Sequence, residues 1–110
     1  MREHIKSDAI NKQINPEKQS RHDINSDGYV KGRSYLLPGI NALELVDKFY
    51  GTGMPKFTNA GNWKNKEVVT TSIDIGILVN PDTGEETVTS NFTIHYSRTG
   101  THVVPAPGKE

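Results

Sequence analysis

The sequence has 110 residues, enough for one small domain with a single hydrophobic core. Its 13 Lys and Arg residues balance 13 Asp and Glu residues, so any affinity for nucleic acid must come from a local patch rather than from net charge. The absence of cysteine excludes disulfides and a thiolate nucleophile, and no apolar run is long enough for a membrane span or a signal peptide. We therefore expect a single domain that makes no membrane contact.

In chain order, the N-terminal third is expected to contain one short helix. Residues 1–14 are mostly polar and fit either a frayed helix or a linker from a larger protein, of which we favour the linker. Asn15 before Pro16 is a helix-start signal, because Asn caps free backbone N–H groups and Pro suits the first helical position. This signal predicts a helix over residues 16–23, followed by a β-prone segment at 29–37.

The clearest helical pattern lies in the middle of the chain. Four apolar residues recur at helical spacing and share one face, namely Ala42, Leu45, Val46 and Phe49. Asn41 fits the N-cap position and Gly51 fits the C-terminal stop. The following segment, residues 51–66, is rich in Gly, Asn and Lys and is predicted to be a loop, in which we expect Trp63 to cap the core.

Strands are predicted for the C-terminal part of the chain. A strand begins near Glu67, which we expect to be solvated, and apolar residues alternate along 73–79. Turn residues at 80–84 then lead to a return strand at 88–97, which is the strongest hairpin signal in the chain. A last short strand is expected at 102–104.

The order of these elements predicts the fold class α+β, with N-terminal helices followed by an antiparallel β-sheet. One domain then spans residues 15–105. The polar segment 1–14 is the linker before it, and residues 106–110 form a flexible tail.

The string FTIHYS at residues 92–97 is the strongest candidate for a functional strand. Alternation sends one set of side chains to the packed face, Phe92, Ile94 and Tyr96, and another to the open face, Thr93, His95 and Ser97. Histidine can accept or donate a proton near neutral pH, and hydroxyl groups can hydrogen-bond a phosphate. RNA carries its own nucleophile in the 2′-hydroxyl, so such a face could cleave RNA with neither a metal nor a cofactor. The alternative is an ordinary solvated sheet face.

Other polar residues could complete such a site. His22 lies beside cations and could supply a second proton-transfer group, and His102 could point into the site or into solvent. A basic groove would be formed by Lys18, Arg21, Lys31, Arg33 and Lys56. For each of these residues alone, a solvated surface position is the more common explanation. The histidines do not show a spacing typical of a metal site.

Several of these strings occur together in the order found in a known family. KQSRH is followed by GRS, by the amphipathic helix closed by GTG, and then by KEVV, DIG and TGEET. The series ends with FTIHYSRTGTHVVP. From about Lys18 to Pro105 the chain therefore resembles the polymorphic toxin type 50 family, also called bacterial toxin 50.

The resemblance implies a fold and an activity. The family is grouped with the barnase, EndoU, colicin and RelE nucleases, in which helices precede a twisted antiparallel sheet that carries the active site on its face. It implies a metal-independent endoribonuclease that cleaves RNA, with tRNA among the possible substrates, by transesterification through the 2′-hydroxyl. It also implies delivery as the tip of a larger toxin into the cytoplasm of a target cell, and a cognate immunity protein. We expect the free toxin domain to be a monomer.

The family pattern suggests a role for individual residues. His95 and His22 are expected to form the acid–base pair, and Arg33 to stabilise the phosphorane. The expected hydroxyl donors are Ser34, Thr93 and Ser97. The expected substrate contacts are Lys18, Lys31, Lys56, Tyr96 and His102.

Two other functions are compatible with the sequence. A non-catalytic protein-binding module on the same fold would tolerate exchange of His95. A DNase would normally need a divalent metal held by a carboxylate cluster, and the densest acids lie at residues 82–86, which are predicted to form a hairpin tip. We therefore expect a ribonuclease rather than a DNase.

Overall fold

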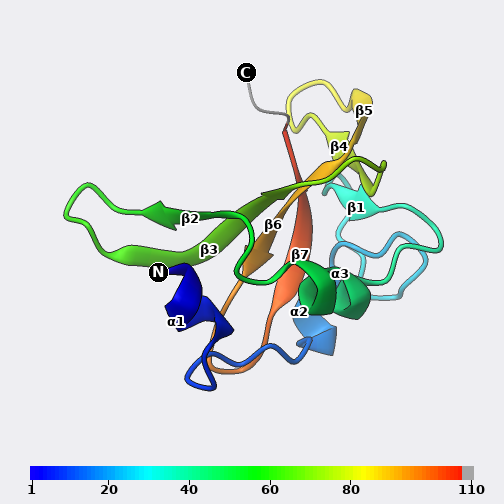
Figure 1. Ribbon diagram of the computed structural model, residues 1–110. Coiled ribbons are helices and arrows are strands. Elements are labelled where there is room, and N and C mark those ends of the chain that lie inside the picture. The colour runs from blue at the N-terminus through cyan, green and yellow to red at the C-terminus, as the bar shows by residue number, and fades with distance from the viewer. Residues whose placement is uncertain (108–110) are drawn as a thin grey trace.

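The computed structural model describes residues 1–107, which form three short helices and seven strands. The helices are α1 (Arg2–Lys6), α2 (Pro16–Ser20) and α3 (Ala42–Phe49). The strands are β1 (Tyr35–Leu36), β2 (Met54–Phe57), β3 (Trp63–Thr70), β4 (Gly76–Val79), β5 (Glu86–Thr89), β6 (Asn91–His95) and β7 (His102–Ala106). Figure 1 shows the helices gathered below the strands, and the predicted α+β class is confirmed.

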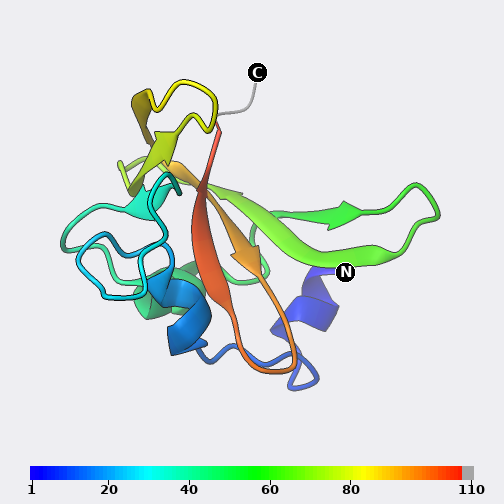
Figure 2. The same ribbon diagram turned by 180° about the vertical axis from the view of Figure 1, so that it is seen from behind.

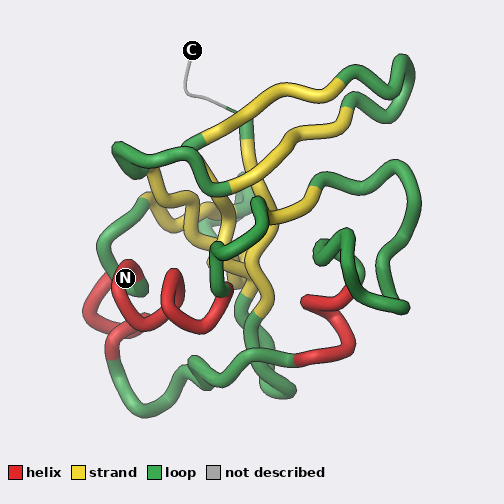
Figure 3. The backbone as a smooth tube through the Cα atoms, turned by 90° about the vertical axis from the view of Figure 1, so that its right-hand side faces the viewer, coloured by secondary structure: helices red, strands yellow, loops and turns green. Residues whose placement is uncertain are grey.

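The strands form two antiparallel sheets. The larger sheet has the order β2-β3-β6-β7, and the smaller one has the order β1-β4-β5. The β2–β3 hairpin projects from the body of the molecule, and the β4–β5 hairpin lies at the end opposite α2 (Figures 1 and 2). A long loop over residues 21–34 connects α2 to β1, and Figure 3 shows the loops of this side of the molecule.

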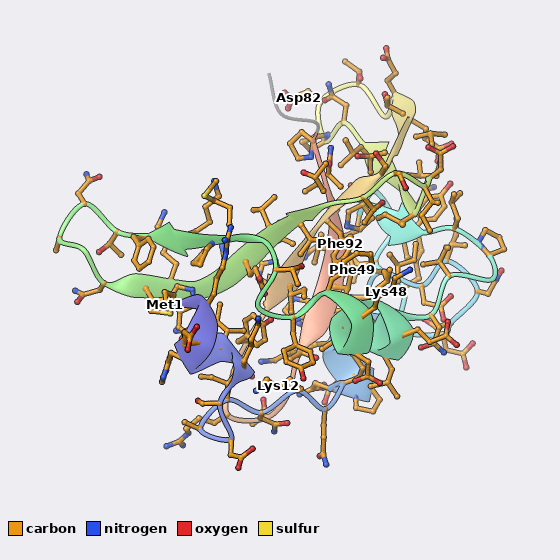
Figure 4. The ribbon with its side chains drawn as sticks, in the orientation of Figure 1. Met1, Lys12, Lys48, Phe49, Asp82 and Phe92 are labelled. Carbon is orange, nitrogen blue, oxygen red and sulfur yellow. The ribbon has the colours of Figure 1, made fainter. Side chains whose placement is uncertain are left out.

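One face of the larger sheet carries the hydrophobic core. Phe92 and Ile94 of β6 are fully buried there. The apolar face of α3 packs on them, and the Phe49 ring meets the Phe92 ring edge-on with centroids 5.8 Å apart (Figure 4). Because side chains alternate along a strand, Thr93 and His95 lie on the opposite, open face, as the sequence predicted.

Both helices predicted from the sequence are present, and their first turns have the expected caps. Asn15 Oδ1 accepts a hydrogen bond from the Lys18 backbone N–H at 3.1 Å, and Asn41 Oδ1 accepts one from the Glu44 N–H at 3.1 Å. After α3 the chain turns at Gly51, whose φ of 76° favours glycine. Helix α2 ends earlier than predicted.

The interpretation of residues 1–14 as a linker differs from the structure. Residues 2–6 form α1, whose Ile5 is fully buried in the core. Arg2 Nε also donates a hydrogen bond to the Gly53 carbonyl at 2.8 Å. The folded domain therefore begins before residue 15, and a single buried isoleucine in a short polar helix is too sparse to produce a helical period.

The predicted C-terminal tail also begins later than expected. Ala106 is buried as the last residue of β7, and residues 108–110 of that tail lie outside the described residues. Strand β7 includes Pro105, which is tolerated because β7 is the edge strand of the larger sheet.

The prediction of a loop over residues 51–66 is wrong, because most of it forms the β2–β3 hairpin. Met54 pairs with Val68, and Phe57 pairs with Trp63. Much of this hairpin is exposed on both faces, so its sequence lacks the alternation that indicates a half-buried strand. Trp63 packs against the core as predicted.

The hairpin predicted around residues 80–84 is present as β4 and β5, but its return strand is shorter than expected. The predicted strand at 88–97 breaks at Ser90, so that β5 pairs with β4 while β6 joins the larger sheet. Residues 88–97 contain no Gly or Pro to mark the break, and the sequence alone therefore predicted one strand.

Candidate functional site

Three histidines from distant parts of the chain form a stacked row, here called the histidine row: His22, His102 and His95. The His95 and His102 rings are 4.4 Å apart between centroids, with an angle of 15° between their planes. The His22 and His102 rings are 5.9 Å apart, with an angle of 11°. The row thus extends from β6 across β7 to the segment after α2.

The register of the larger sheet places two of these histidines together. His95 of β6 lies directly opposite His102 of β7, and on its other side it lies opposite Lys66 of β3. Directly opposite residues point to the same face of a sheet, so all three side chains share the open face with Thr93. The alternatives for His102 are resolved, because its ring points toward His95.

His22 reaches the row from the end of α2. The Gln19 side chain fixes this helix on the free edge of β7, since its Nε2 donates to the Val103 carbonyl at 3.0 Å and its Oε1 accepts from the Val103 N–H at 2.6 Å. His22 Nδ1 lies 2.9 Å from the Ser34 carbonyl oxygen. A carbonyl only accepts, so Nδ1 carries the proton and Nε2 is the nitrogen left for other contacts.

Burial and nearby positive charge keep the histidine row neutral at pH 7. Burial, followed by the charge of Lys66, lowers the pKa of His95 to about 4. Burial, followed by the neighbouring His95, lowers the pKa of His102 to about 4. Burial also lowers the pKa of His22, although its hydrogen bond to Ser34 acts in the opposite direction. These shifts follow from the cost of placing charge in a desolvated, positively charged environment.

Four cations lie close enough to the row to affect its pKa values: Lys18, Arg21, Arg33 and Lys66. The acidic β4–β5 turn, which includes Asp82, lies at the end of the molecule opposite α2 (Figure 4). Positive charge beside neutral imidazoles is suited to binding a phosphate and to moving protons. Of the predicted groove, Lys18, Arg21 and Arg33 thus lie near the histidines.

The other two predicted groove residues are not among the cations that shift the pKa values of the row. Lys31 is exposed on the loop before β1. Lys56 of β2 lines a cavity with Thr93 and Asn91, farther along the open face of the larger sheet. Three of the five predicted cations therefore flank the histidine row, and Lys56 lies at the cavity.

Two of the predicted hydroxyl donors make hydrogen bonds that hold the fold together. Ser34 Oγ accepts from the Val79 N–H at 3.0 Å and ties the loop before β1 to β4. Ser97 Oγ donates to the Gly100 carbonyl at 2.8 Å within the β6–β7 turn. Thr93 is the predicted hydroxyl residue that shares the open face with His95.

The prediction of Tyr96 as a substrate contact is wrong. Its side chain is buried on the core side, and its hydroxyl donates to Glu67 Oε1 at 2.7 Å. Burial and the neighbouring carboxylate raise the pKa of Tyr96. Glu67 was expected to be solvated but is fully buried, where it also accepts from the backbone N–H groups of Gly51 and Gly53 at 3.0 and 2.7 Å.

Sequence reasoning missed Lys66 and Asn91. Lys66 was placed at the end of a predicted loop, because the run Lys66, Glu67, Val68 and Val69 does not alternate polar with apolar residues, although burial alternates along it in the structure. Asn91 is buried at the start of β6. Neither cross-strand pairing nor burial can be read from a single sequence, and both residues depend on them.

Within residues 1–107, no group of three or more His, Cys, Asp or Glu side chains is arranged to hold a metal ion. The rings of the histidine row are stacked face to face rather than converging on a point. The helices of this part of the chain are also too short to cross a membrane.

The fold and the site define a small α+β domain with a cation-flanked histidine row on an open sheet face. The family model described as Bacterial toxin 50 matches residues 14–105, most of the chain, and this domain therefore belongs to that family of bacterial toxins. The family resemblance seen in the sequence is confirmed. No match was found among curated proteins.

Proposed function

We propose that this toxin domain is an endoribonuclease that cleaves RNA through the 2′-hydroxyl without a metal. The observation that carries the proposal is the histidine row, in which His22, His102 and His95 lie beside cations on one sheet face. A bacterial toxin must act on something essential in its target, and RNA is a substrate that this set of groups can attack.

The proposed reaction requires two proton transfers at one phosphate. A neutral imidazole removes the proton from the 2′-hydroxyl, and the oxygen attacks phosphorus. The bond from phosphorus to the 5′-oxygen then breaks, and a second imidazole gives that oxygen its proton. The products are a 2′,3′-cyclic phosphate and a 5′-hydroxyl, and cations stabilise the charge of the phosphorane between them.

The low pKa values suit the first proton transfer, in which a histidine acts as a base. At pH 7 the histidines are neutral, so an imidazole is already in the form that accepts a proton. The acid has to be protonated, and the anionic phosphate would raise the pKa of the imidazole that it contacts. We assign the two roles to His95 and His22 at the ends of the row, with His102 between them and Lys18, Arg33 or Lys66 on the phosphate.

The toxin family gives this activity a biological setting. The domain would be carried on a larger protein into the cytoplasm of a target cell, where it meets RNA, and the producing cell would need an immunity protein that blocks it. Burial of the open face of the sheet by such an inhibitor would suffice. The alternative function is a protein-binding module that uses the same face without chemistry.

The test is RNA cleavage in excess EDTA by the wild type and by His95→Ala, His22→Ala and His102→Ala. We expect cleavage that leaves 2′,3′-cyclic phosphate ends, and a loss of about a hundredfold or more when His95 or His22 is removed. His4→Ala is the matched control, because His4 lies on α1 beside Trp63 and outside the row. Intact RNA with the wild type would refute the proposal and favour the binding module.

A further inference from the structure

The open face of the larger sheet continues from the histidine row into a cavity of about 540 Å³. This volume is typical of sites for small molecules, which are roughly 300–1,000 Å³. Side chains of different chemistry line it: Arg2, Met54, Lys56, Thr70, Asn91 and Thr93. We refer to this space as the β2–β6 cavity.

Asn91 is the unusual member of the lining. Its side chain is only 8% exposed, and within the described part of the chain its Oδ1 has no hydrogen-bond partner. Its backbone is anchored, since the Asn91 N–H donates to Thr89 Oγ1 at 3.1 Å and this hydroxyl donates to the Ala106 carbonyl at 2.7 Å. A buried acceptor without a donor is costly in a folded protein, so a bound group that donates to Asn91 Oδ1 would be favoured here.

The Asn91 side chain can meet such a ligand. The last torsion of an asparagine side chain is broad, so rotation of the Asn91 amide about this torsion can present Oδ1 to the cavity that the residue lines. An amide offers one acceptor and one donor side by side, which matches the hydrogen-bonding edge of a nucleobase.

The rest of the lining fits a nucleotide. Met54 and Val68 supply apolar contact for the flat faces of a base. Lys56 and Arg2 supply positive charge for phosphate, and Arg2 is held in place by its hydrogen bond to the Gly53 carbonyl. Apolar, amide and cationic groups in one cavity are the combination that a nucleotide requires.

The cavity is continuous with the histidine row along β6. Thr93 lines the cavity and lies two residues from His95 on the same face, a separation of roughly 6.6 Å along a strand. Asn91 lies two residues farther on, at roughly 13 Å from His95 along the strand. An RNA strand cleaved at His95 would therefore place a neighbouring nucleotide over the cavity.

We propose that the β2–β6 cavity binds one nucleobase of the RNA substrate next to the cleaved phosphate, and that Asn91 selects this base. The proposal rests on the ribonuclease function proposed above, because that function puts RNA on this face. It makes cleavage base-selective at one position, whereas the histidine row and its cations recognise only the sugar-phosphate chain.

The test is an NMR titration of the whole domain with each of the four nucleoside 3′-monophosphates and with inorganic phosphate. We expect one nucleotide to shift the Asn91, Thr70 and Thr93 signals at about tenfold lower concentration than the others, the weaker end of discrimination by a side-chain–base pair. Asn91→Ala should remove this preference. Lys56→Gln should weaken all four nucleotides alike, and Lys48→Gln on α3 should change neither property.

Each other outcome overturns the inference. Equal affinity for all four nucleotides, or shifts with inorganic phosphate alone, would show a simple anion site or no site. An unchanged preference in Asn91→Ala would show that other residues select the base. The titration needs no turnover, so failure of the subsite and failure of the ribonuclease proposal are distinguishable. Selective binding without RNA cleavage would support the subsite and refute the activity.

Discussion

Acidification should destabilise the domain through its histidine row. In the folded state the pKa values of His95 and His102 are lowered to about 4. In the unfolded chain they return to the ordinary value of about 6.5, so the unfolded state binds more protons between these two values. Protonation of these two histidines therefore does not destabilise the fold above about pH 6.5. As the pH is lowered from about 6.5 toward about 4, it lowers the free energy of unfolding progressively.

The size of the effect follows from the two shifts. Each corresponds to about 3 kcal/mol at most, since one pKa unit is worth about 1.4 kcal/mol. Repulsion between the same two rings contributes to both shifts, and both rings keep partial contact with water. We therefore expect a combined loss of about 3 kcal/mol rather than twice that amount.

The assay is urea unfolding at about pH 7 and about pH 4.5, with the wild type compared to His102→Gln. The variant removes one titrating ring and relieves the repulsion on His95, so its acid-induced loss should be about 2 kcal/mol smaller. Groups outside the histidine row titrate equally in both proteins and cancel in the comparison. His4→Gln on the exposed side of α1 should behave as the wild type. Equal acid dependence of the wild type and His102→Gln would refute the reasoning.

Two further predictions concern stability. Glu67→Ala should lower the free energy of unfolding by about 3–5 kcal/mol, because it leaves two backbone N–H groups and the Tyr96 hydroxyl without their acceptor. In the same urea titration, Glu67→Gln should lower this free energy by less, and Glu85→Ala on an exposed turn should leave it almost unchanged. Ile5→Ala should lower the free energy of unfolding by about 2–5 kcal/mol, because the Ile5 side chain is completely buried and anchors α1 in the core. An unchanged melting temperature in Ile5→Ala would mean that α1 does not contribute to the fold.

The local elements were largely predictable from the sequence. The caps at Asn15 and Asn41 and the apolar face of α3 are written in neighbouring residues, and the structure shows them as predicted. Alternation along residues 92–97 likewise separated the core side of β6 from its open side. Where elements carry no periodic pattern, as in α1 and the β2–β3 hairpin, the sequence predicted a linker and a loop instead.

The arrangement of the site was decided by tertiary structure. The sequence nominated His22 and His95 separately, but the stacking of both around His102 depends on strand register and on the docking of α2 against β7. The burial of Glu67 depends on the close approach of Gly51 and Gly53. Periodicity fixes which face of an element is buried, because it depends on neighbours in the chain. Which residues meet across strands is fixed by packing between distant segments, and this information appears only when the chain is folded.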